Sequence, residues 1–468
     1  MKKVLAFDFG ASSGRAILGE YENGKLRYSE VHRFENTPVQ QDGHLRWDFP
    51  DLMKNVHIAI EKAGKVDSIA FDTWGVDFGL LDKDGKLLEN PVHYRDTRTE
   101  HTLEKAFAVM DEQQLYAATG NQLMAINTLF QLMETDLSKA DKMLFMPDLF
   151  AYQLCGNAVC EQSIASTSQL LDLNEKSWSK PVLDAFKISQ QLFAPLVQSG
   201  SVIGEYNGAK IVSVAGHDTQ SAVAAMPSQQ EDAAFLSCGT WSLLGCELDQ
   251  PVLTEESRKA ELSNELGANG KINYLKNITG LWLIQESRRQ WQREGKNYSF
   301  AEIAELAQKA QPMRCFVDVN APDLALPGDI PSRIQAHCEK TGQYVPQTVG
   351  EIARCIYESL ALCYKNTLGQ MQQLTGKRFS VLHMLGGGCN AALLCQLTAD
   401  ALGIPVKAGP VEATALGNII LQLKALGELE TIGQGRALIA ATEPIKQYYP
   451  IDQENWIAYT AFKNVLEK

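Results

Sequence analysis

Two stretches that lie far apart in the chain have the same local pattern, and this repeat constrains the fold more than any other feature. Residues 3–10 form an apolar run that ends in a glycine, and residues 233–239 form a second such run. A short turn with Ser or Thr and another apolar run follow each of them, which is the pattern of a β-hairpin. Because such hairpins are common, the repeat alone leaves chance similarity open. Taken as a true repeat, it indicates two related domains, residues 1–226 and 227–468.

The order of strand and helix patterns predicts the α/β fold class. Alternating runs at the start of the chain predict three antiparallel strands, joined in part by an Asn23-Gly24 turn that favours a tight hairpin. Towards the other end, a strand, a glycine-rich turn, a helix with Asn390 near its cap and a further strand form a parallel α/β unit. The main expected strands are 3–9, 15–21, 26–34, 68–71, 211–214, 233–237, 242–248, 379–385 and 404–407, and the main expected helices are 48–63, 282–291, 349–374, 390–402 and 412–427.

Charge and composition exclude several classes of protein. The chain has 468 residues and a formal net charge of −13, whereas nucleic acid and anionic membranes are bound by dense cationic surfaces. No stretch approaches the ~18 consecutive apolar residues of a membrane span. The ten cysteines contain no Cys-x-x-Cys pair and indicate reduced, mostly buried thiols. We therefore expect a cytoplasmic protein that binds neither nucleic acid nor membrane.

Asp218 is the first candidate for chemistry. It lies just past the short apolar run 211–214, beyond Gly216, where the backbone can turn sharply. A carboxylate between two similar halves suggests a general base between two bound substrates. The alternative is that Asp218 caps the following helix, because Asp is strongly preferred at that position. The eight residues 215–222 alone favour the cap.

The run Gly386-Gly387-Gly388 is the second candidate. A glycine-rich turn from strand to helix lets backbone amides approach a nucleotide, whose negative charge the helix N-terminus favours. The pattern Gly386-x-Gly388-x-x-Ala391, with Glu412 further on, also matches a loose dinucleotide fingerprint and leaves an NAD-linked oxidoreductase open. A third interpretation is close helix–sheet packing that needs small residues. The chain has no P-loop sequence.

The two hairpin turns can supply the remaining parts of a phosphoryl-transfer site. Such a site needs donors around the phosphates, a cation on their oxygens and a carboxylate to accept the proton of the nucleophile. The first hairpin offers Asp8 for the cation, and Ser12, Ser13 and Arg15 for the phosphates; the second offers Thr240. Two phosphate hairpins with a later nucleotide turn predict the actin-like two-domain ATPase architecture, with a central cleft.

Several motifs also carry a resemblance to a known family. They are Asp8-Phe9-Gly10-Ala11-Ser12-Ser13-Gly14-Arg15, Asp72-Thr73-Trp74-Gly75-Val76-Asp77-Phe78, Tyr94-Arg95-Asp96, Gly216-His217-Asp218-Thr219, Cys238-Gly239-Thr240-Trp241-Ser242 and Gly386-Gly387-Gly388-Cys389. Over essentially its whole length the sequence resembles the FGGY carbohydrate kinases. The family often has Thr at the position of Ala11, and the hydroxyl of Ser12 or Ser13 could replace that contact.

The resemblance implies ATP and Mg²⁺ as co-substrate and cofactor, a ketose as acceptor, and a role for each candidate residue. Asp218 would be the catalytic base. Asp8 would be associated with Mg²⁺, in part through water. The ATP contacts would be Ala11, Ser12, Ser13, Gly14, Arg15, Thr240, Gln285, Gly386, Gly387 and Gly388, and the ketose contacts would be Gly75, His217, Asp218, Thr219 and Asn277.

Other points stay open at the level of sequence. Trp74 and Asp77 fit a sugar pocket and fit aromatic packing equally well. Close stereoisomers of the ketose are not distinguished, and the oligomeric state is not predicted. A non-catalytic sugar sensor on the same fold is the alternative from another functional class, although a sensor needs no base.

Overall fold

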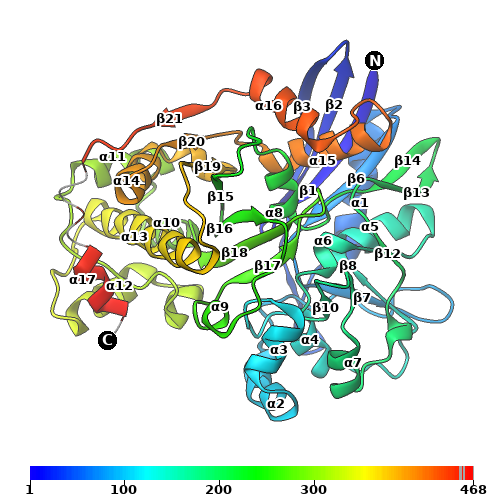
Figure 1. Cartoon of the computed structure of the whole chain (residues 1–468), viewed down its shortest axis with the longest axis horizontal. Coiled ribbons are helices and arrows are strands. Elements are labelled where there is room, and N and C mark those ends of the chain that lie inside the picture. The colour runs from blue at the N-terminus through cyan, green and yellow to red at the C-terminus, as the bar shows by residue number, and fades with distance from the viewer. Residues whose placement is uncertain (453–455, 457–458, 467–468) are drawn as a thin grey trace. The chain divides into compact units, whose positions relative to one another are not determined.

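The computed structural model describes residues 1–452, 456 and 459–466, and the chain divides into two compact units. Unit 1 comprises residues 1–229, 247–275 and 413–442. Unit 2 comprises residues 230–246, 276–412 and 443–468. Each unit is therefore built from several segments, and the chain passes from one to the other more than once (Figure 1).

The centre of unit 1 is a six-stranded sheet in the order β13-β14-β6-β1-β2-β3. Strand β1 (Lys2–Phe9) runs antiparallel to β2 (Ser13–Glu22), and β2 runs antiparallel to β3 (Lys25–Glu35), which confirms the expected three-stranded opening. On the other side, β1 is parallel to β6 (Ser68–Thr73), which is parallel to β14 (Ala209–Ser213). Strand β13 (Ser201–Tyr206) pairs with β14 at the edge.

Helix α15 (Ala413–Ala425) comes from the late segment of the chain and packs against β1, β6 and α8 (Asp218–Ala224) within unit 1 (Figure 1). Its apolar side is buried with the sheet, as Val4 and Ile419 illustrate in the same core cluster. The contact with α8 is very close, because a Cβ at Gly417 would lie 1.7 Å from the carbonyl oxygen of Ser221. Only glycine allows this approach.

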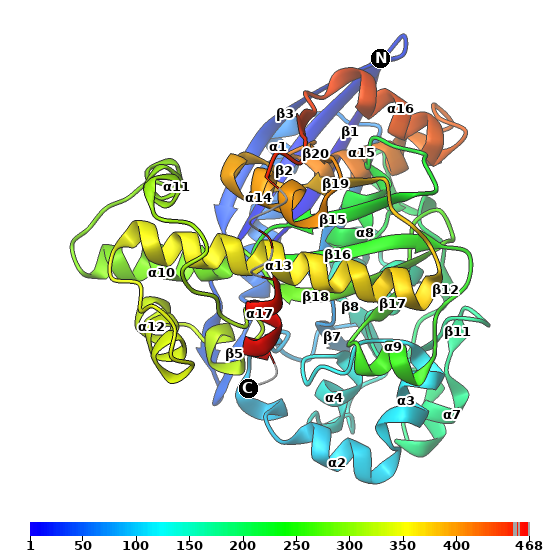
Figure 2. The ribbon, with the colours of Figure 1, turned by 60° about the vertical axis from the view of Figure 1, so that its left-hand side comes forward.

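In unit 2, β15 (Ala233–Cys238) and β16 (Trp241–Leu248) form the second expected hairpin. Strand β19 (Val381–Leu385) lies parallel to β15, and β20 (Val406–Ala408) lies parallel to β19, as predicted for the α/β unit. Strand β21 (Lys446–Tyr448) completes this side antiparallel to β20. The long helix α13 (Val349–Thr375) packs beside α14 (Ala392–Leu402), as Figure 2 shows.

Most of the expected elements agree with the structure to within a few residues, with one correction after the glycine run. The helix expected over residues 390–402 begins two residues later, because residues Gly387–Asn390 form a single 3₁₀ turn and α14 begins at Ala392, which leaves Asn390 next to the N-cap. Ala391 is the N-cap residue and makes no side-chain capping hydrogen bond. The glycine-rich turn thus leads into a tighter, irregular segment before the helix.

Among the described residues, no helix is long and apolar enough to cross a membrane. The remaining strands are β4 (Val39–Gln41), β5 (His44–Arg46), β7 (Phe78–Leu81), β8 (Lys142–Phe145), β9 (Cys160–Glu161), β10 (Leu171–Asp172), β11 (Ser177–Trp178), β12 (Leu196–Val197), β17 (Ser263–Leu266) and β18 (Ile272–Thr279). The remaining helices are α1 (Phe49–Ala63), α2 (Thr102–Val109), α3 (Glu112–Thr119), α4 (Thr128–Met133), α5 (Met146–Cys155), α6 (Gln162–Ala165), α7 (Lys180–Ala185), α9 (Glu255–Lys259), α10 (Trp282–Arg293), α11 (Phe300–Lys309), α12 (Ile330–Lys340), α16 (Ile432–Thr442) and α17 (Tyr459–Leu466).

Candidate active site

The turn of the first hairpin is fixed by hydrogen bonds on both sides. The Gly10 N–H donates to the Ser13 carbonyl oxygen at 2.9 Å. Asn36 braces the turn from the end of β3, since its backbone N–H donates to the Ser12 carbonyl oxygen at 3.1 Å and its side-chain amide donates to Gly10 at 3.0 Å. Ala11 and Ser12 are left partly or fully exposed at the tip. Asn36 is a positioning residue that the sequence patterns did not indicate.

Two carboxylates lie opposite each other where β1 and β6 end. Asp8 and Asp72 are register partners in this parallel pair, so their side chains emerge on the same face of the sheet. Arg15, the antiparallel partner of Asp8, donates to its Oδ2 from Nε at 3.0 Å and Nη2 at 2.8 Å. The Arg15 guanidinium thus neutralises Asp8 from within the same hairpin.

Asp72 is completely buried. Its Oδ2 accepts a hydrogen bond from the Asn418 side chain at 2.7 Å, while its buried Oδ1 has no hydrogen-bond partner. Burial and the negative charge of Asp8 raise the pKa of Asp72 well above its usual range, against the lowering effect of Asn418. One carboxylate oxygen of this pair therefore has no hydrogen-bond partner, and a cation bound here would stabilise the negative charge of the pair.

Asp218 is the first residue of α8, and His217 is the N-cap residue. The interpretation of Asp218 as the cap is therefore wrong. The Asp218 Oδ1 accepts from the Thr219 backbone N–H at 2.6 Å and from the Thr219 hydroxyl at 3.3 Å. One third of the Asp218 side chain is exposed. Loss of water raises its pKa to about 6, with His217 opposing this rise and Asp8 adding to it.

His217 is held between two carboxylates. Its Nδ1 lies 2.9 Å from Oε2 of Glu265, on β17, and its Nε2 lies 3.4 Å from Oδ1 of Asp218. The side-chain amide of Gln220 also donates to Glu265, at 2.7 Å. Burial alone would lower the pKa of His217, but Glu265 outweighs it and the pKa is raised. Glu265 fixes the orientation of the imidazole, and it lies too far along the chain for the local motif to indicate it.

The backbone before Asp218 is anchored by Glu161. Its Oε2 accepts the Gly216 N–H at 3.0 Å and the Ser163 hydroxyl at 2.5 Å. On the opposite side the Thr73 N–H donates to the Gly216 carbonyl oxygen at 2.8 Å. This bond places the end of β6, and thus the turn that contains Gly75, beside the stretch that leads into α8.

The turn after β6 contains a strained residue. Val76 has φ of 68°, which is unfavourable for a β-branched side chain. The Val76 N–H donates to Thr167 Oγ1 at 3.2 Å, and the Val76 carbonyl oxygen accepts from Thr128 Oγ1 at 2.7 Å. Two buried hydroxyls thus hold a backbone shape that places Gly75 against the Thr167 side chain.

Asp77 organises the aromatic side chains next to this turn. Its Oδ2 accepts from the indole N–H of Trp47 at 2.7 Å and of Trp74 at 3.0 Å, while its Oδ1 accepts from Gln131 at 2.9 Å. Asp77 is fully buried, and burial raises its pKa to about 6. With both oxygens engaged, Asp77 fits the packing interpretation better than direct contact with a sugar.

In unit 2, the turn of the second hairpin is tied to helix α10. The Gly280 N–H donates to the Thr240 carbonyl oxygen at 3.1 Å, and the Thr240 hydroxyl donates to Oε1 of Gln285 at 3.2 Å. A Cβ at Gly280 would lie 2.6 Å from Oγ of Ser242. Thr240 and Gln285 are therefore brought together, and Asn277 precedes Gly280 on the part of β18 that belongs to this unit.

The glycine run meets the same hairpin. Strands β15 and β19 end side by side, because Ser237 pairs with Leu385. A Cβ at Gly388 would lie 2.2 Å from Sγ and 2.9 Å from the carbonyl oxygen of Cys238, whereas nothing lies within 4 Å of one at Gly387. Gly388 is thus a packing glycine, as one interpretation of the run expected, and Gly387 is exposed.

Each candidate residue therefore falls in one of two groups. Unit 1 contains Asp8, Ala11, Ser12, Ser13, Gly14, Arg15, Gly75, His217, Asp218 and Thr219, and unit 2 contains Thr240, Asn277, Gln285, Gly386, Gly387 and Gly388.

Comparison with known protein families decides the class of protein. Residues 3–235 match the N-terminal domain, and residues 234–426 the C-terminal domain, of the FGGY family of carbohydrate kinases. The chain belongs to the FGGY carbohydrate kinases. As an FGGY kinase it is an enzyme that transfers phosphate to a sugar-type substrate, which excludes the dinucleotide-linked oxidoreductase and the sensor.

Curated relatives of this FGGY kinase match over nearly the full length. The rhamnulokinase of Enterococcus faecalis is 41% identical, with 98% of this chain and 97% of the relative covered. The rhamnulokinase of Bacteroides thetaiotaomicron is 40% identical, with 99% of each chain covered, and that of Bacillus subtilis is 38% identical, with 99% and 98% covered.

Solved structures show the fold. A xylulose kinase from Lactobacillus acidophilus superposes with a TM-score of 0.81 at 19% identity, covering 100% of this chain and 97% of the other. Glycerol kinase from Plasmodium falciparum superposes with a TM-score of 0.78 at 16% identity, covering 100% and 98%. These matches confirm the predicted α/β fold class, the actin-like ATPase fold of the FGGY kinases.

Proposed function

We propose that this FGGY kinase transfers the γ-phosphoryl group of ATP to the C1 hydroxyl of L-rhamnulose, which yields L-rhamnulose 1-phosphate and ADP in L-rhamnose catabolism. The observation that carries the chemistry is the carboxylate of Asp218, partly exposed at the start of α8 with a pKa raised to about 6. The full-length similarity to rhamnulokinases supports the substrate. Another ketose such as L-fuculose is the alternative.

In this mechanism Asp218 accepts the proton of the C1 hydroxyl while the oxygen attacks the γ-phosphorus and ADP leaves. A pKa near 6 keeps the base ionised at neutral pH and still able to accept a proton. His217 and Thr219 flank the base and would bind the ketose, together with Gly75 and Asn277. Positioning supplies much of the rate acceleration.

The phosphates of ATP would be held by the two hairpins. Residues 11–15 of the N-terminal domain (1–226) and Thr240 of the C-terminal domain (227–468) would donate to them. Gln285 and the run 386–388 would line the adenosine side. The hydrogen bond from Thr240 to Gln285 supports this grouping, since it joins a phosphate turn to an adenosine-side residue.

The carboxylates of Asp8 and Asp72 fit a magnesium ion. Mg²⁺ prefers oxygen ligands and keeps several waters, and the buried Oδ1 of Asp72 has no other partner. When bound, Mg²⁺ supplies positive charge that neutralises the phosphate oxygens. Asp8 and Asp72 would hold this ion directly or through water, and Arg15 would then be released from Asp8 towards the phosphates.

A coupled assay of ADP formation with Asp218→Asn tests the catalytic role. The variant should lose ~10²–10⁴ of kcat, while calorimetry shows that the ketose still binds. Turnover near that of the wild type would exclude Asp218 as the base. A panel of ketoses with the wild-type enzyme tests the substrate separately. A higher kcat/KM for L-fuculose than for L-rhamnulose would overturn the substrate and leave the kinase mechanism intact.

We further propose that the enzyme works in the cytoplasm. All ten cysteines are free thiols and nine of them are buried, as expected for a protein that folds under reducing conditions.

A further inference from the structure

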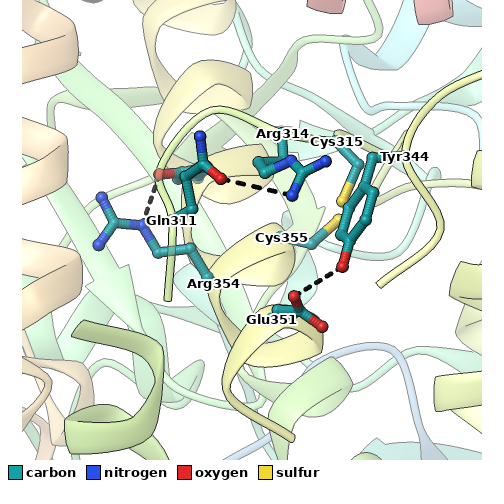
Figure 3. A pocket seen from close by; sticks show the side chains of 8 residues that line it. Gln311, Arg314, Cys315, Tyr344, Glu351, Arg354 and Cys355 are labelled. Atoms are coloured by element: carbon teal, nitrogen blue, oxygen red, sulfur yellow. Dashed lines mark hydrogen bonds and ion pairs between the residues drawn. The ribbon is translucent and has the colours of Figure 1, made fainter. Parts of the chain in front are cut away.

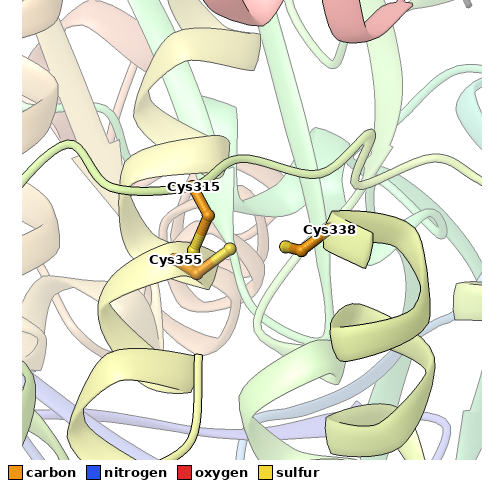
Figure 4. Close-up of side chains that lie close together, drawn as sticks. All are labelled: Cys315, Cys338 and Cys355. Atoms are coloured by element: carbon orange, nitrogen blue, oxygen red, sulfur yellow. The ribbon is translucent and has the colours of Figure 1, made fainter. Parts of the chain in front are cut away.

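Three buried cysteine thiols, none of them a candidate residue of the kinase reaction, meet at one point in unit 2. The Sγ atoms of Cys315, Cys338 and Cys355 all lie within 4.8 Å of one another. Figure 4 shows that they converge from three separate pieces of chain. Cys315 lies in the segment after α11, Cys338 lies in the last turn of α12, and Cys355 lies in the second turn of α13.

The surrounding contacts hold this arrangement in place. The N–H of Phe316 donates to the Gln343 side chain at 2.9 Å, and the N–H of Val317 donates to the hydroxyl of Ser359 on α13 at 3.0 Å. The segment that carries Cys315 is therefore fixed against α13 and against the loop that follows α12. The three thiols are preorganised and do not depend on a mobile loop.

The spacing of the sulfur atoms suits a metal ion. Zinc binds thiolates at about 2.3 Å in a tetrahedron, so the ligand sulfurs of a zinc site lie about 3.8 Å apart. If the sulfur–sulfur distances shortened by about 1 Å from their observed upper limit, all three thiolates could bind one zinc ion. Three thiolates are soft donors, which favour zinc over magnesium or calcium.

A fourth coordination position is available beside the thiols. A small cavity of about 10 Å³ is lined by Cys315 and Cys355 together with Arg314, Tyr344 and Arg354, among others (Figure 3). This is about the space that one water molecule requires. A water in this cavity would complete a tetrahedral site with three protein ligands.

The charged side chains around the cavity are also compatible with a zinc ion bound by three thiolates. Three thiolates and one Zn²⁺ carry a net charge of −1, which is costly to bury without a partner. The Arg314 guanidinium lies 3.5 Å from the centre of the Tyr344 ring at the cavity wall, and Arg354 pairs with Glu358 at 2.5 Å. The carboxylates of Glu351 and Glu358 also line the cavity. Because Glu358 is paired with Arg354, Arg314 is the guanidinium that would offset the negative charge.

We propose that Cys315, Cys338 and Cys355 bind one zinc ion, with a water molecule as the fourth ligand. The ion would join α12, α13 and the segment around Cys315, and it would stabilise this lobe of unit 2 without taking part in phosphoryl transfer. Binding would displace the three thiol protons, so that zinc affinity would fall as the pH is lowered.

Cobalt(II) substitution in the full-length protein tests the site directly. The protein is isolated with a phosphine reductant, freed of metal with a chelator and titrated with cobalt. We expect one cobalt per chain, with a thiolate-to-metal charge-transfer band and the visible bands of tetrahedral cobalt, which zinc then displaces. Serine at position 315, 338 or 355 (C315S, C338S, C355S) should weaken zinc binding by more than about 100-fold, beyond the usual effect of losing an outer-shell partner.

Cys363→Ser is the matched control, because Cys363 is a buried cysteine on the same helix as Cys355 but outside the cluster. It should leave cobalt binding unchanged. A rise in the melting temperature of the wild type on addition of zinc, absent in C338S, provides a second readout if one serine variant folds poorly. The proposal is overturned if cobalt gives no stoichiometric band, if the band survives in the cluster variants, if only copper(I) binds, or if thiols trapped by alkylation in cells show a disulfide within the cluster.

Discussion

Asp218 is a charged group in surroundings that disfavour its charge. Loss of water and the negative charge of Asp8 raise its pKa to about 6, so the folded protein binds a proton at this position more tightly than the unfolded chain does. The unfolding free energy consequently falls as the pH rises from about 4 to about 6. The ionised form that would serve as the proposed base therefore destabilises the enzyme at neutral pH.

Asp218→Asn should therefore stabilise the protein at alkaline pH while it lowers kcat. Two pKa units correspond to about 3 kcal/mol, and the partial exposure of the side chain reduces this to about 1 kcal/mol. We expect a higher melting temperature than that of the wild type at about pH 8 and no difference at about pH 4. Equal melting temperatures at both pH values would show that Asp218 is not strained by burial.

Turnover should increase with pH over the same range in which the unfolding free energy decreases. Because Asp218 must be ionised to accept the proton, kcat/KM for the ketose should rise with pH and level off above about 6. Initial rates between about pH 5 and 8 at saturating ATP measure this profile. A flat profile in the wild type would contradict the assigned pKa.

The sequence indicated the candidate residues that lie within one motif and missed the residues that contact them from distant segments. Asp218, His217 and Thr219 are neighbours in the chain, so the motif contains them. Glu265, which orients His217, and Asn418, which donates to Asp72, come from segments 48 and 346 positions away. An isolated Glu or Asn in an otherwise ordinary strand or helix carries no signal of its partner.

At the scale of elements, the glycine run offers a matched pair of variants. Gly388→Ala would place a methyl group 2.2 Å from Sγ of Cys238, so the run must move away from the end of β15. We expect a loss of ~1–3 kcal/mol in stability and an increase in the KM for ATP, with the KM for the ketose unchanged. Gly387→Ala meets no atom within 4 Å and should keep the stability of the wild type. Equal stability of both variants would contradict the close approach at Gly388.

The strained turn after β6 gives a second prediction. Thr167→Val removes the acceptor of the Val76 N–H and leaves this donor buried, at a cost of ~1–3 kcal/mol. Because the turn also carries Gly75, the KM for the ketose should increase while the KM for ATP stays unchanged. Ser201→Ala, a hydroxyl on the edge strand β13, is a control that should change neither. An unchanged KM for the ketose in Thr167→Val would show that this turn does not contribute to the sugar pocket.

Hairpins and long helices could be predicted because their signals are local. The strands around Gly10 and Gly239 and the helix at 349–374 have clear turn residues or periodicity and lie where expected. The boundaries after Gly388 could not be predicted, since the 3₁₀ turn is set by the contact with Cys238. The return of residues 247–275 and 413–442 to unit 1 is likewise a property of tertiary packing.

For the whole molecule, ligand binding should appear as a gain in stability. ATP with Mg²⁺ at 100 times its Kd should stabilise the protein by about 2.7 kcal/mol, whereas NAD should have no effect. Thermal denaturation with each nucleotide measures this difference. Asp8→Asn should reduce the part of the gain that requires Mg²⁺, because one of the two proposed carboxylates is lost. A shift with NAD equal to that with ATP would contradict the proposed nucleotide specificity.

The position of α15 in the chain has a consequence for biosynthesis. The side chain of Asn418 donates to Asp72 at 2.7 Å, and that of Gln422 donates to the carbonyl oxygen of Leu5 at 3.2 Å. A nascent chain of 400 residues would therefore hold the first sheet on the ribosome with its buried carboxylate unpaired and one face uncovered. We therefore expect the packing of the N-terminal sheet to be completed only after nearly complete translation, and a premature stop after about residue 410 to release a product that chaperones and proteases recognise as incompletely folded.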